Sequence, residues 1–219
     1  MTTLTLSRLV RWSGQMLCLG FACVAWSGAD VGLINQMQGE VTYQGGSAAT
    51  RATPFMKVRE GDRFTVAEGA LLRVVYFDGG RQETWKGPAV FKAGAKQGDA
   101  TAGRPEVSQV PGSAPAKLAQ TAEVIQIAKL GRAGGVTVRG IKTQQLSASQ
   151  SAEVASAKKT YDAWRATAAA DDITPELYLY TVLDSHMMYE DMKTVVKAMQ
   201  ERQPGSQEVK ELAAWVSGR

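Results

Sequence analysis

Cysteine and histidine, the residues that carry most thiol and metal chemistry, are nearly absent from this sequence. Its 219 residues include only Cys18, Cys23 and His186. Both cysteines lie in an N-terminal segment that we expect to be removed, which leaves no thiol for a disulfide, a thiolate metal site or a nucleophile. One histidine without cysteine cannot build a typical zinc site, and nothing around it resembles a nucleophile elbow. The sequence therefore predicts no catalytic residue, no metal site and no cofactor.

A strong net charge is also missing. Lys and Arg number 25 against 21 Asp and Glu, a formal charge of +4. Two of the positive charges, Arg8 and Arg11, belong to the N-terminal segment. The small remainder argues against nucleic acid as a partner, because phosphate backbones are bound by clusters of cations. With 44% hydrophobic and 21% charged residues, the composition is that of a globular protein.

The third absence is a hydrophobic run long enough to cross a membrane. A spanning helix needs about 20 apolar residues, whereas the apolar run 16–26 is stopped by the small residues 27–29 and Asp30. With Arg8 and Arg11 before it, the segment 1–29 has the layout of a secretory signal peptide. We expect cleavage after Ala29 and a periplasmic or otherwise extracytoplasmic protein without a stable membrane span. Retention of the segment as an anchor is the alternative.

Residues 30–93 alternate β-prone runs with glycine-containing turns, the rhythm of a small all-β domain. The run Leu71–Phe77 is the most apolar, and we expect it at the centre of the core, followed by a hairpin turn at Asp78-Gly79. Tyr76 and Trp85 are predicted to be core or cross-strand partners. The strands predicted from the pattern are Val31–Gln38 and Glu40–Gln44, which flank Gly39 as a pair, and then Arg63–Val66, Leu71–Phe77, Gln82–Trp85 and Ala89–Lys92, whereas 48–54 is predicted to be a loop.

The acids of this region are interpreted as turn residues. Asp78 suits a turn because its side chain tolerates and caps such backbones. Glu60, Asp62 and Glu68 do not have the spacing of a calcium loop. We expect them to be solvated.

Five short motifs in this region together resemble the FecR-like domain, a periplasmic family first recognised in a regulator of ferric-citrate transport. In sequence order they are Gly39-Glu40-Val41, Glu60-Gly61-Asp62, Glu68-Gly69-Ala70, the strand into Phe77-Asp78-Gly79, and Gly87-Pro88-Ala89-Val90. The resemblance covers about residues 32–93 and implies an extracytoplasmic, β-rich domain. Founding members relay a signal to a cytoplasmic sigma factor through a membrane helix. Too few residues precede the apolar run for a sigma-binding domain, so the chain looks more like stand-alone exported members.

Residues 94–146 form the expected linker and middle segment. Residues 94–115 are rich in Gly, Ala, Gln and Pro and are predicted to be a flexible linker or surface loop. The stretch Ala116–Ala128 fits a helix, although 124–127 equally fits a strand, and a short strand is predicted around Thr137. Glycines near Lys129, Arg132 and Arg139 lack the order of a phosphate-binding loop. A mild basic patch that meets an anionic envelope polymer or lipid headgroup is the other interpretation.

Residues 147–219 are predicted to be helical. Ser149 or Ser151 caps the first predicted helix, which runs through Arg165 toward Ala170. The helix from Thr174 has Thr as N-cap and Pro at its first position. The remaining predictions are inner residues Ala155, Tyr161 and Trp164 in the first helix, an end near Met187 for the second, a third helix Tyr189–Arg202 with Met192, Val195, Val196 and Met199 inside, and a fourth begun by Ser206 with Val209, Leu212 and Val216 inside.

Helices joined by short turns over Thr174–Val216 weakly resemble a tetratricopeptide hairpin. Tyr180 and Met192 occupy positions where that family has small residues. Because a single hairpin cannot bury its own apolar face, it must pack on the preceding helix, on the β region or on a partner. Met187 and Met188 beside His186 are interpreted as core and not as a metal site.

The sequence as a whole predicts an α+β protein: signal peptide 1–29, FecR-like β domain 30–93, linker and middle segment 94–146, and helical module 147–219. The function that fits is a non-catalytic envelope protein that binds or scaffolds another envelope protein or a cell-wall polymer. A regulatory sensor acting with a membrane partner is one alternative. A hydrolase that uses two carboxylates is the other, and it requires Asp or Glu side chains that converge in one pocket.

Overall fold

The computed structural model describes residues 28–133 and 146–219 and confirms the α+β class. The strands are β1 Asp30–Gln38, β2 Val41–Gln44, β3 Thr50–Arg51, β4 Lys57–Arg59, β5 Arg63–Val66, β6 Leu71–Tyr76, β7 Arg81–Lys86, β8 Ala89–Ala93, β9 Gly98–Ala102 and β10 Glu106–Gln109. The helices are α1 Ala114–Ala133, α2 Ala148–Arg165, α3 Thr174–Ser185, α4 Tyr189–Arg202 and α5 Gln207–Ser217. The signal segment up to residue 27 and the strand predicted around Thr137 lie outside the described residues.

The strands form two antiparallel sheets of five, in the orders β10-β7-β6-β1-β4 and β3-β2-β5-β8-β9. The predicted hairpin at Asp78-Gly79 is confirmed, because β6 pairs with β7 directly across it. The predicted pairing of the two strands that flank Gly39 is wrong, since β1 pairs with β4 and β6 whereas β2 pairs with β3 and β5. Gly39 has a φ of 76°, and a Cβ there would lie 2.9 Å from the Ala70 Cβ. At this corner the chain therefore passes from one sheet to the other.

Apolar side chains fill the space between the two sheets. Trp85 is fully buried and stacks on Phe91, with ring centroids 4.2 Å apart and planes 5° apart. Tyr76 is also fully buried, and β6 is the middle strand of its sheet, so both the predicted core role of Tyr76 and Trp85 and the predicted central position of this strand are confirmed. Burying an aromatic or large aliphatic side chain contributes about 1.5–3 kcal/mol.

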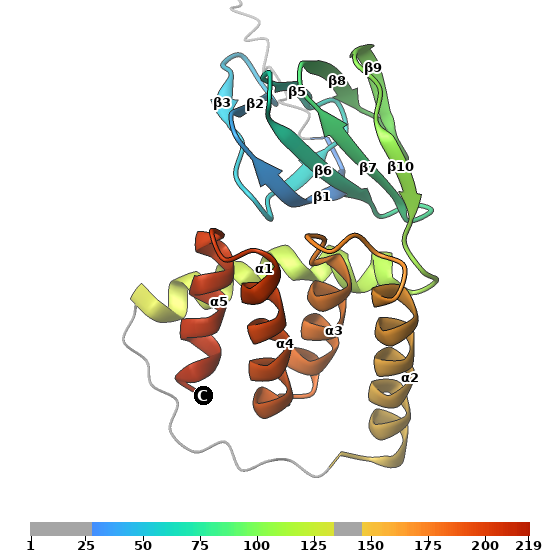
Figure 1. Cartoon of the computed structure of the whole chain (residues 1–219), viewed down its shortest axis with the longest axis vertical. Helices are drawn as coiled ribbons and strands as arrows, with labels where there is room; N and C mark the ends of the chain where they lie inside the picture. Colours follow the sequence, from blue (N-terminus) through green and yellow to red (C-terminus); the bar gives the residue numbers. More distant parts are fainter. Residues whose placement is uncertain (1–27, 134–145) are drawn as a thin grey trace, which may run out of the picture.

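The helices cover the outer face of the β1-containing sheet. In Figure 1 the sandwich lies at one end of the molecule, α1 crosses beneath it, and α2 to α5 run across the direction of α1 and away from the sandwich. Leu33 and Val75 point out of the sandwich and belong to the same apolar cluster as Leu118 of α1 and Leu177 of α3. This sheet is consequently buried on both faces, and the two halves of the chain share a core.

The linker predicted for residues 94–115 is wrong over half of its length, because it contains β9, β10 and the start of α1. β9 pairs with β8, and β10 pairs with β7. Gly98, which suggested flexibility, is a point of close approach: a Cβ there would lie 2.8 Å from the Phe91 ring and 2.9 Å from Glu83 and Trp85. A glycine in this segment can therefore be needed because there is no room for a side chain, and not only because the chain turns there.

Helix starts agree with the sequence better than helix ends do. Helix α4 spans the predicted residues and buries the predicted methionines and valines, and the Ser206 side chain accepts the Val209 N–H at the start of α5 as predicted. Helix α2 begins earlier than predicted, after Ser147, and ends at Arg165, well short of Ala170. Its buried residues are Val154, Ala157 and Trp164, whereas Ala155 is exposed because it lies off that stripe.

One alternative left open by the sequence is decided by packing, and one predicted helix cap is corrected. The stretch 116–128 is helical throughout, with Leu118 and Ile125 buried one above the other at helical spacing. Helix α3 does begin at Thr174 and ends at Ser185, but the N-cap position is Ile173 and not Thr174. The Asp172 carboxylate, two residues earlier, accepts the Thr174 N–H at 2.9 Å.

Candidate functional site

A β-bulge in β1 creates the surface on which the helices meet the sandwich. The pairing of β1 with β6 shifts register between Ile34 and Gln36. A bulge puts an extra residue in one strand and interrupts the alternation of faces. As a result two neighbouring amides point toward the helices: Asn35 Nδ2 donates to Thr174 Oγ1 as well as to Gln82 Oε1 on β7, the latter at 3.1 Å, and Gln36 Nε2 donates to Asp171 Oδ2 at 2.8 Å.

Asp172 is the centre of a buried polar network between the two halves. Its carboxylate is 4% exposed and accepts hydrogen bonds from Gln82 Nε2 at 3.0 Å and from both the backbone N–H and the hydroxyl of Thr174. Arg73 Nη1 lies 3.4 Å from Asp172 Oδ1, while Arg73 Nε donates to Thr84 Oγ1 at 2.9 Å. Because the donors come from both β strands and α3, this network fixes how the helices sit on the sheet.

A second buried carboxylate, Glu176, joins three helices. It is fully buried and accepts from Arg202 Nε at 2.9 Å, from Arg165 Nη1 at 3.1 Å and from the Tyr161 hydroxyl at 3.2 Å. Burial and the Glu176 charge together raise the pKa of Tyr161. Arg202 Nη1 also donates to the Ala170 carbonyl at 3.2 Å. The end of α4 is thereby held against the loop that precedes α3.

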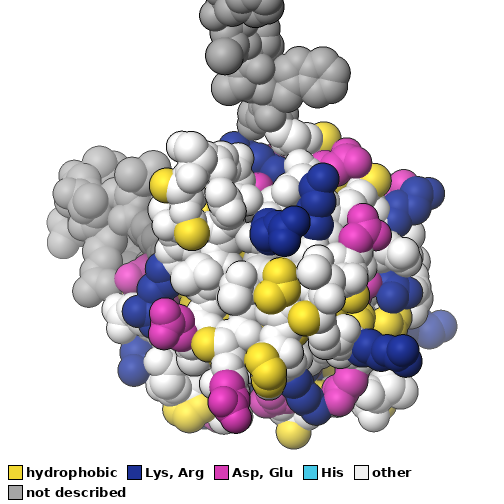
Figure 2. All heavy atoms as spheres, turned by 90° about the horizontal axis from the view of Figure 1, so that it is seen from above, with side chains coloured by type: hydrophobic (Ala, Val, Ile, Leu, Met, Phe, Trp, Pro, Cys, Tyr) yellow, Lys and Arg dark blue, Asp and Glu magenta, His cyan; other side chains and the backbone are white. Residues whose placement is uncertain are grey.

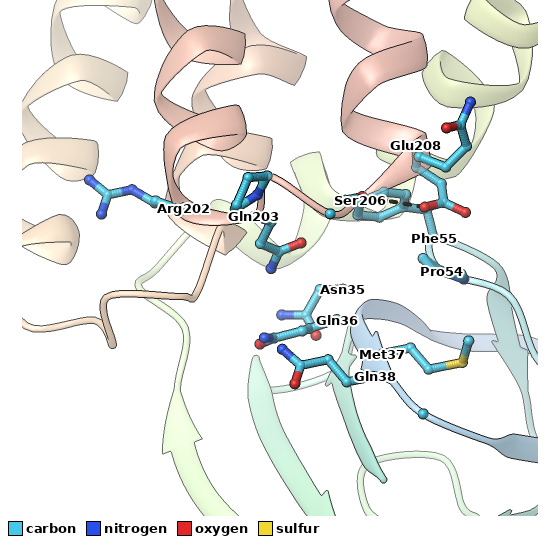
Figure 3. A pocket seen from close by; sticks show the side chains of 14 residues that line it. Asn35, Gln36, Met37, Gln38, Pro54, Phe55, Arg202, Gln203, Ser206 and Glu208 are labelled. Atoms are coloured by element: carbon cyan, nitrogen blue, oxygen red, sulfur yellow. Dashed lines mark hydrogen bonds between the residues drawn. The ribbon is translucent and has the colours of Figure 1, made fainter.

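Beside these networks a cleft of about 560 Å³ opens between β1 and the α4–α5 turn. In Figure 3 the side chain of Gln203 reaches from the helices toward Asn35 and Gln36 on the strand below, with Gln38 next to them. The opposite wall carries Pro54, Phe55, Ser206 and Glu208. A volume of this size lies in the range of small-ligand sites, about 300–1,000 Å³.

The polar lining of this junction cleft is dominated by amides. Gln203 Nε2 is fixed by the Asp171 carbonyl at 2.9 Å, whereas Gln38 and Gln207 are exposed at its rim. The two charged groups have opposite sign: Arg202 is paired with Glu176, and Glu208 accepts from the Ser206 hydroxyl at 3.3 Å. The cleft therefore has many hydrogen-bonding groups and no excess of charge.

Backbone strain marks one lip of the cleft. Phe55 has a φ of 62°, a left-handed conformation that is rare for aromatic residues. Its N–H donates to the Ile34 carbonyl at 2.8 Å, and its side chain is buried in the core shared with the helices. Because of this conformation, residues 55 and 56, which precede β4, also form backbone hydrogen bonds with Ile34 of β1.

The acids and the histidine that the sequence singled out do not gather in the cleft. Asp78 lies in the β6–β7 turn, as predicted, and pairs with Lys96 at 3.1 Å. Asp62 was expected to be solvated but is 5% exposed, because its carboxylate accepts the Arg59 N–H at 2.9 Å. Over residues 28–133 and 146–219, no group of three or more His, Cys, Asp or Glu side chains could hold a metal ion.

His186 lies at the far end of the helices. Its Nε2 is 3.3 Å from Glu153 Oε2. The hydrogen bond from Lys117 holds the pKa of the Glu153 carboxyl below its usual value, with His186 adding to the effect. The side chains of Lys129, Arg132 and Arg139, considered for phosphate binding, lie outside the described residues.

Charge is mixed over the face seen in Figure 2. Lys and Arg side chains alternate there with Asp and Glu, and apolar side chains occur singly or in small groups. In the described part of the chain, no helix is long and apolar enough to cross a membrane.

The amides of the junction cleft were missed because polar residues without unusual spacing give no motif. A weak signal exists in hindsight: two short amide-containing stretches, Asn35–Gln38 and Gln203–Gln207, line the cleft from opposite sides. No protein-family model, no curated protein and no solved structure matches the chain. The functional argument consequently depends on the geometry of this chain alone.

Proposed function

We propose that the protein is a non-catalytic, exported component of the cell envelope that binds an envelope protein or a cell-wall polymer at the junction cleft. The observation that carries this proposal is the cleft itself, a depression with both polar and apolar lining that is built jointly by the sandwich and the helical module. The FecR-like motifs of the sandwich and the signal-like segment 1–29 support the extracytoplasmic setting.

The surroundings of the acids favour binding over hydrolysis. Asp172 and Glu176 each accept several hydrogen bonds from cationic or neutral donors. Glu83, also fully buried, accepts from Arg81 Nε, from Trp85 Nε1 and from the Gly98 N–H. A general acid or base must be able to exchange a proton with a substrate in a cleft. Carboxylates whose oxygens already accept several hydrogen bonds within the protein are better explained as groups that stabilise the fold.

In-cell photo-crosslinking tests the proposal. A photoreactive benzoylphenylalanine at Gln207, exposed at the cleft rim, is expected to trap an envelope component. The same residue at Gln97, exposed in the β8–β9 turn on the sandwich, is the matched control and is expected to trap little. Equal yields from both positions, or no adduct from either, would contradict binding at the cleft. An adduct with a membrane protein would favour the sensor alternative.

A further inference from the structure

Side chains of three helices surround one guanidinium group at the end of the helical module that is remote from the sandwich. Arg219 Cζ lies 4.7 Å from the centre of the Trp215 ring on α5 and 5.8 Å from the centre of the Tyr189 ring at the start of α4. Burial raises the pKa of the Asp184 carboxyl near the end of α3, and the charge of Arg219 opposes this rise. Together Asp184, Tyr189 and Trp215 form an aromatic cage, and Figure 1 shows this end of α5 pointing away from the sandwich.

The cage is suited to a planar cation. Its two rings are 6.1 Å apart and inclined by 69°, so they are not stacked on each other. Both rings are partly buried, and each lies within the distance of about 6 Å over which an aromatic face attracts a cation. A guanidinium stacks on aromatic faces better than an ammonium does, because it is flat and weakly hydrated. The carboxylate of Asp184 adds an opposite charge nearby.

The residue that occupies the cage is attached in a way that lets it leave. Arg219 is exposed and follows Gly218, the C-cap residue of α5. Its N–H donates to the Val216 carbonyl at 3.1 Å. Because Arg219 lies beyond the last helical residue, its side chain can move off the rings without unfolding a helix. The faces of Tyr189 and Trp215 that it covers would then be open to another cation.

We propose that the aromatic cage binds an arginine side chain of a partner protein, and that Arg219 occupies the same cage when the partner is absent. The contact made by Arg219 identifies the chemistry that the cage accepts, a planar cation over an indole and near a carboxylate. A partner arginine must displace Arg219, so the affinity of the wild type is reduced to the fraction of molecules whose cage is free. The cage lies on a different surface from the junction cleft, and its role does not depend on the function proposed for that cleft.

A titration followed by nuclear magnetic resonance tests this inference, with the peptide acetyl-Gly-Arg-Gly-amide added to the mature protein. The reporter is the indole N–H signal of Trp215, assigned by its loss in Trp215→Phe. In Arg219→Ala we expect this signal to shift saturably, with an affinity severalfold higher than in the wild type. Lys210→Ala, which removes an exposed cation from the same helix, is the matched control and is expected to bind like the wild type.

Two further comparisons examine the chemistry of the cage. Asp184→Asn in the Arg219→Ala background is expected to weaken binding severalfold, because it removes the opposite charge. The lysine peptide acetyl-Gly-Lys-Gly-amide is expected to bind more weakly than the arginine peptide. Circular dichroism of each variant shows that a loss of binding is not a loss of fold.

Three outcomes would contradict the proposal. Absence of a saturable shift in Arg219→Ala overturns the binding site. Equal affinities of Arg219→Ala and the wild type overturn the occupancy by Arg219, and equal affinities for the two peptides overturn the assignment to arginine. If Arg219 were only a structural contact, Arg219→Ala would lower the midpoint of urea unfolding without any gain in peptide binding.

Discussion

Glu176 accepts hydrogen bonds from three side chains that belong to α2 and α4, while its own helix is α3. A carboxylate can be fully buried here because two guanidinium groups face it. An intact buried ion pair contributes only modestly to the free energy of unfolding. Removing one member is much more destabilising, because the remaining charges are then buried without a partner. At the residue scale, this acid is the position in the helical half most sensitive to a change of charge.

Glu176→Gln is expected to lower the free energy of unfolding by about 3 kcal/mol, because Arg165 and Arg202 lose the charge that offsets their partial burial. Urea denaturation followed by circular dichroism measures the change. Glu190→Gln removes an exposed acid that pairs with Lys193 and serves as the control, with little change expected. Equal effects of the two substitutions would show that the buried pairs are not needed.

At the scale of elements, β9 shows how a glycine can serve packing. Its first residue, Gly98, lies against Phe91, Trp85 and Glu83, and its N–H donates to Glu83 Oε2 at 3.1 Å. The φ of Gly98 is not in the left-handed region, so the constraint is space and not backbone conformation. The strand pairs with β8 and closes the edge of its sheet over the stacked aromatic rings.

Gly98→Ala is therefore expected to destabilise the protein by about 1–3 kcal/mol through overpacking. The midpoint of urea unfolding, followed by Trp fluorescence, reports the loss. Gly46→Ala is a suitable control, since a Cβ at Gly46 meets nothing within 4 Å. A neutral Gly98→Ala variant would mean that β9 moves away easily and that the strand is only loosely attached.

At the scale of the whole molecule, the β10-β7-β6-β1-β4 sheet is the layer that both halves share. One face packs against the second sheet, and the other meets α1, α3 and the loop before α3. Asp172 bonds Gln82 and lies beside Arg73 on the sheet while it caps Thr174 on α3. We infer that the sandwich and the helices unfold as one unit.

The wild type is expected to show one urea transition, with coincident midpoints from circular dichroism, dominated by the helices, and from Trp85 fluorescence in the sandwich. To isolate that signal, Trp164 and Trp215 are replaced by Phe.

In this background Asp172→Ala is expected to lower the free energy of unfolding by about 3 kcal/mol and to separate the two midpoints, because the buried Arg73 loses its partner. Glu106→Ala, which removes an exposed ion pair with Lys86, is the control. Two separate transitions in the unsubstituted background would contradict a shared unit.

Local signals in the sequence determined much of the secondary structure. The apolar run into Asp78-Gly79 gave the central strand and its hairpin, and the spacing of Met192, Val195 and Met199 gave α4. These succeed because turns, caps and periodicity depend on neighbours in the chain. Strand β10 and the pairing partners of β1 were missed, since both depend on distant segments. Strand β9 was missed although it forms a local hairpin with β8, because its sequence Gly-Asp-Ala-Thr-Ala has no β-prone apolar pattern.

What covers each face was decided only by tertiary structure. In β6, Arg73 lies between Leu72 and Val74, and in β7, Gln82 and Thr84 lie on either side of Glu83, so these polar residues by sequence indicate a solvent face. The structure buries all three beneath the loop before α3. Alternation reveals that two faces differ, but not whether water or a helix lies against the polar one. The bulge in β1 turns Asn35 and Gln36 toward the helical half, where Asn35 donates to Thr174 at the start of α3 and Gln36 to Asp171 in the loop before it.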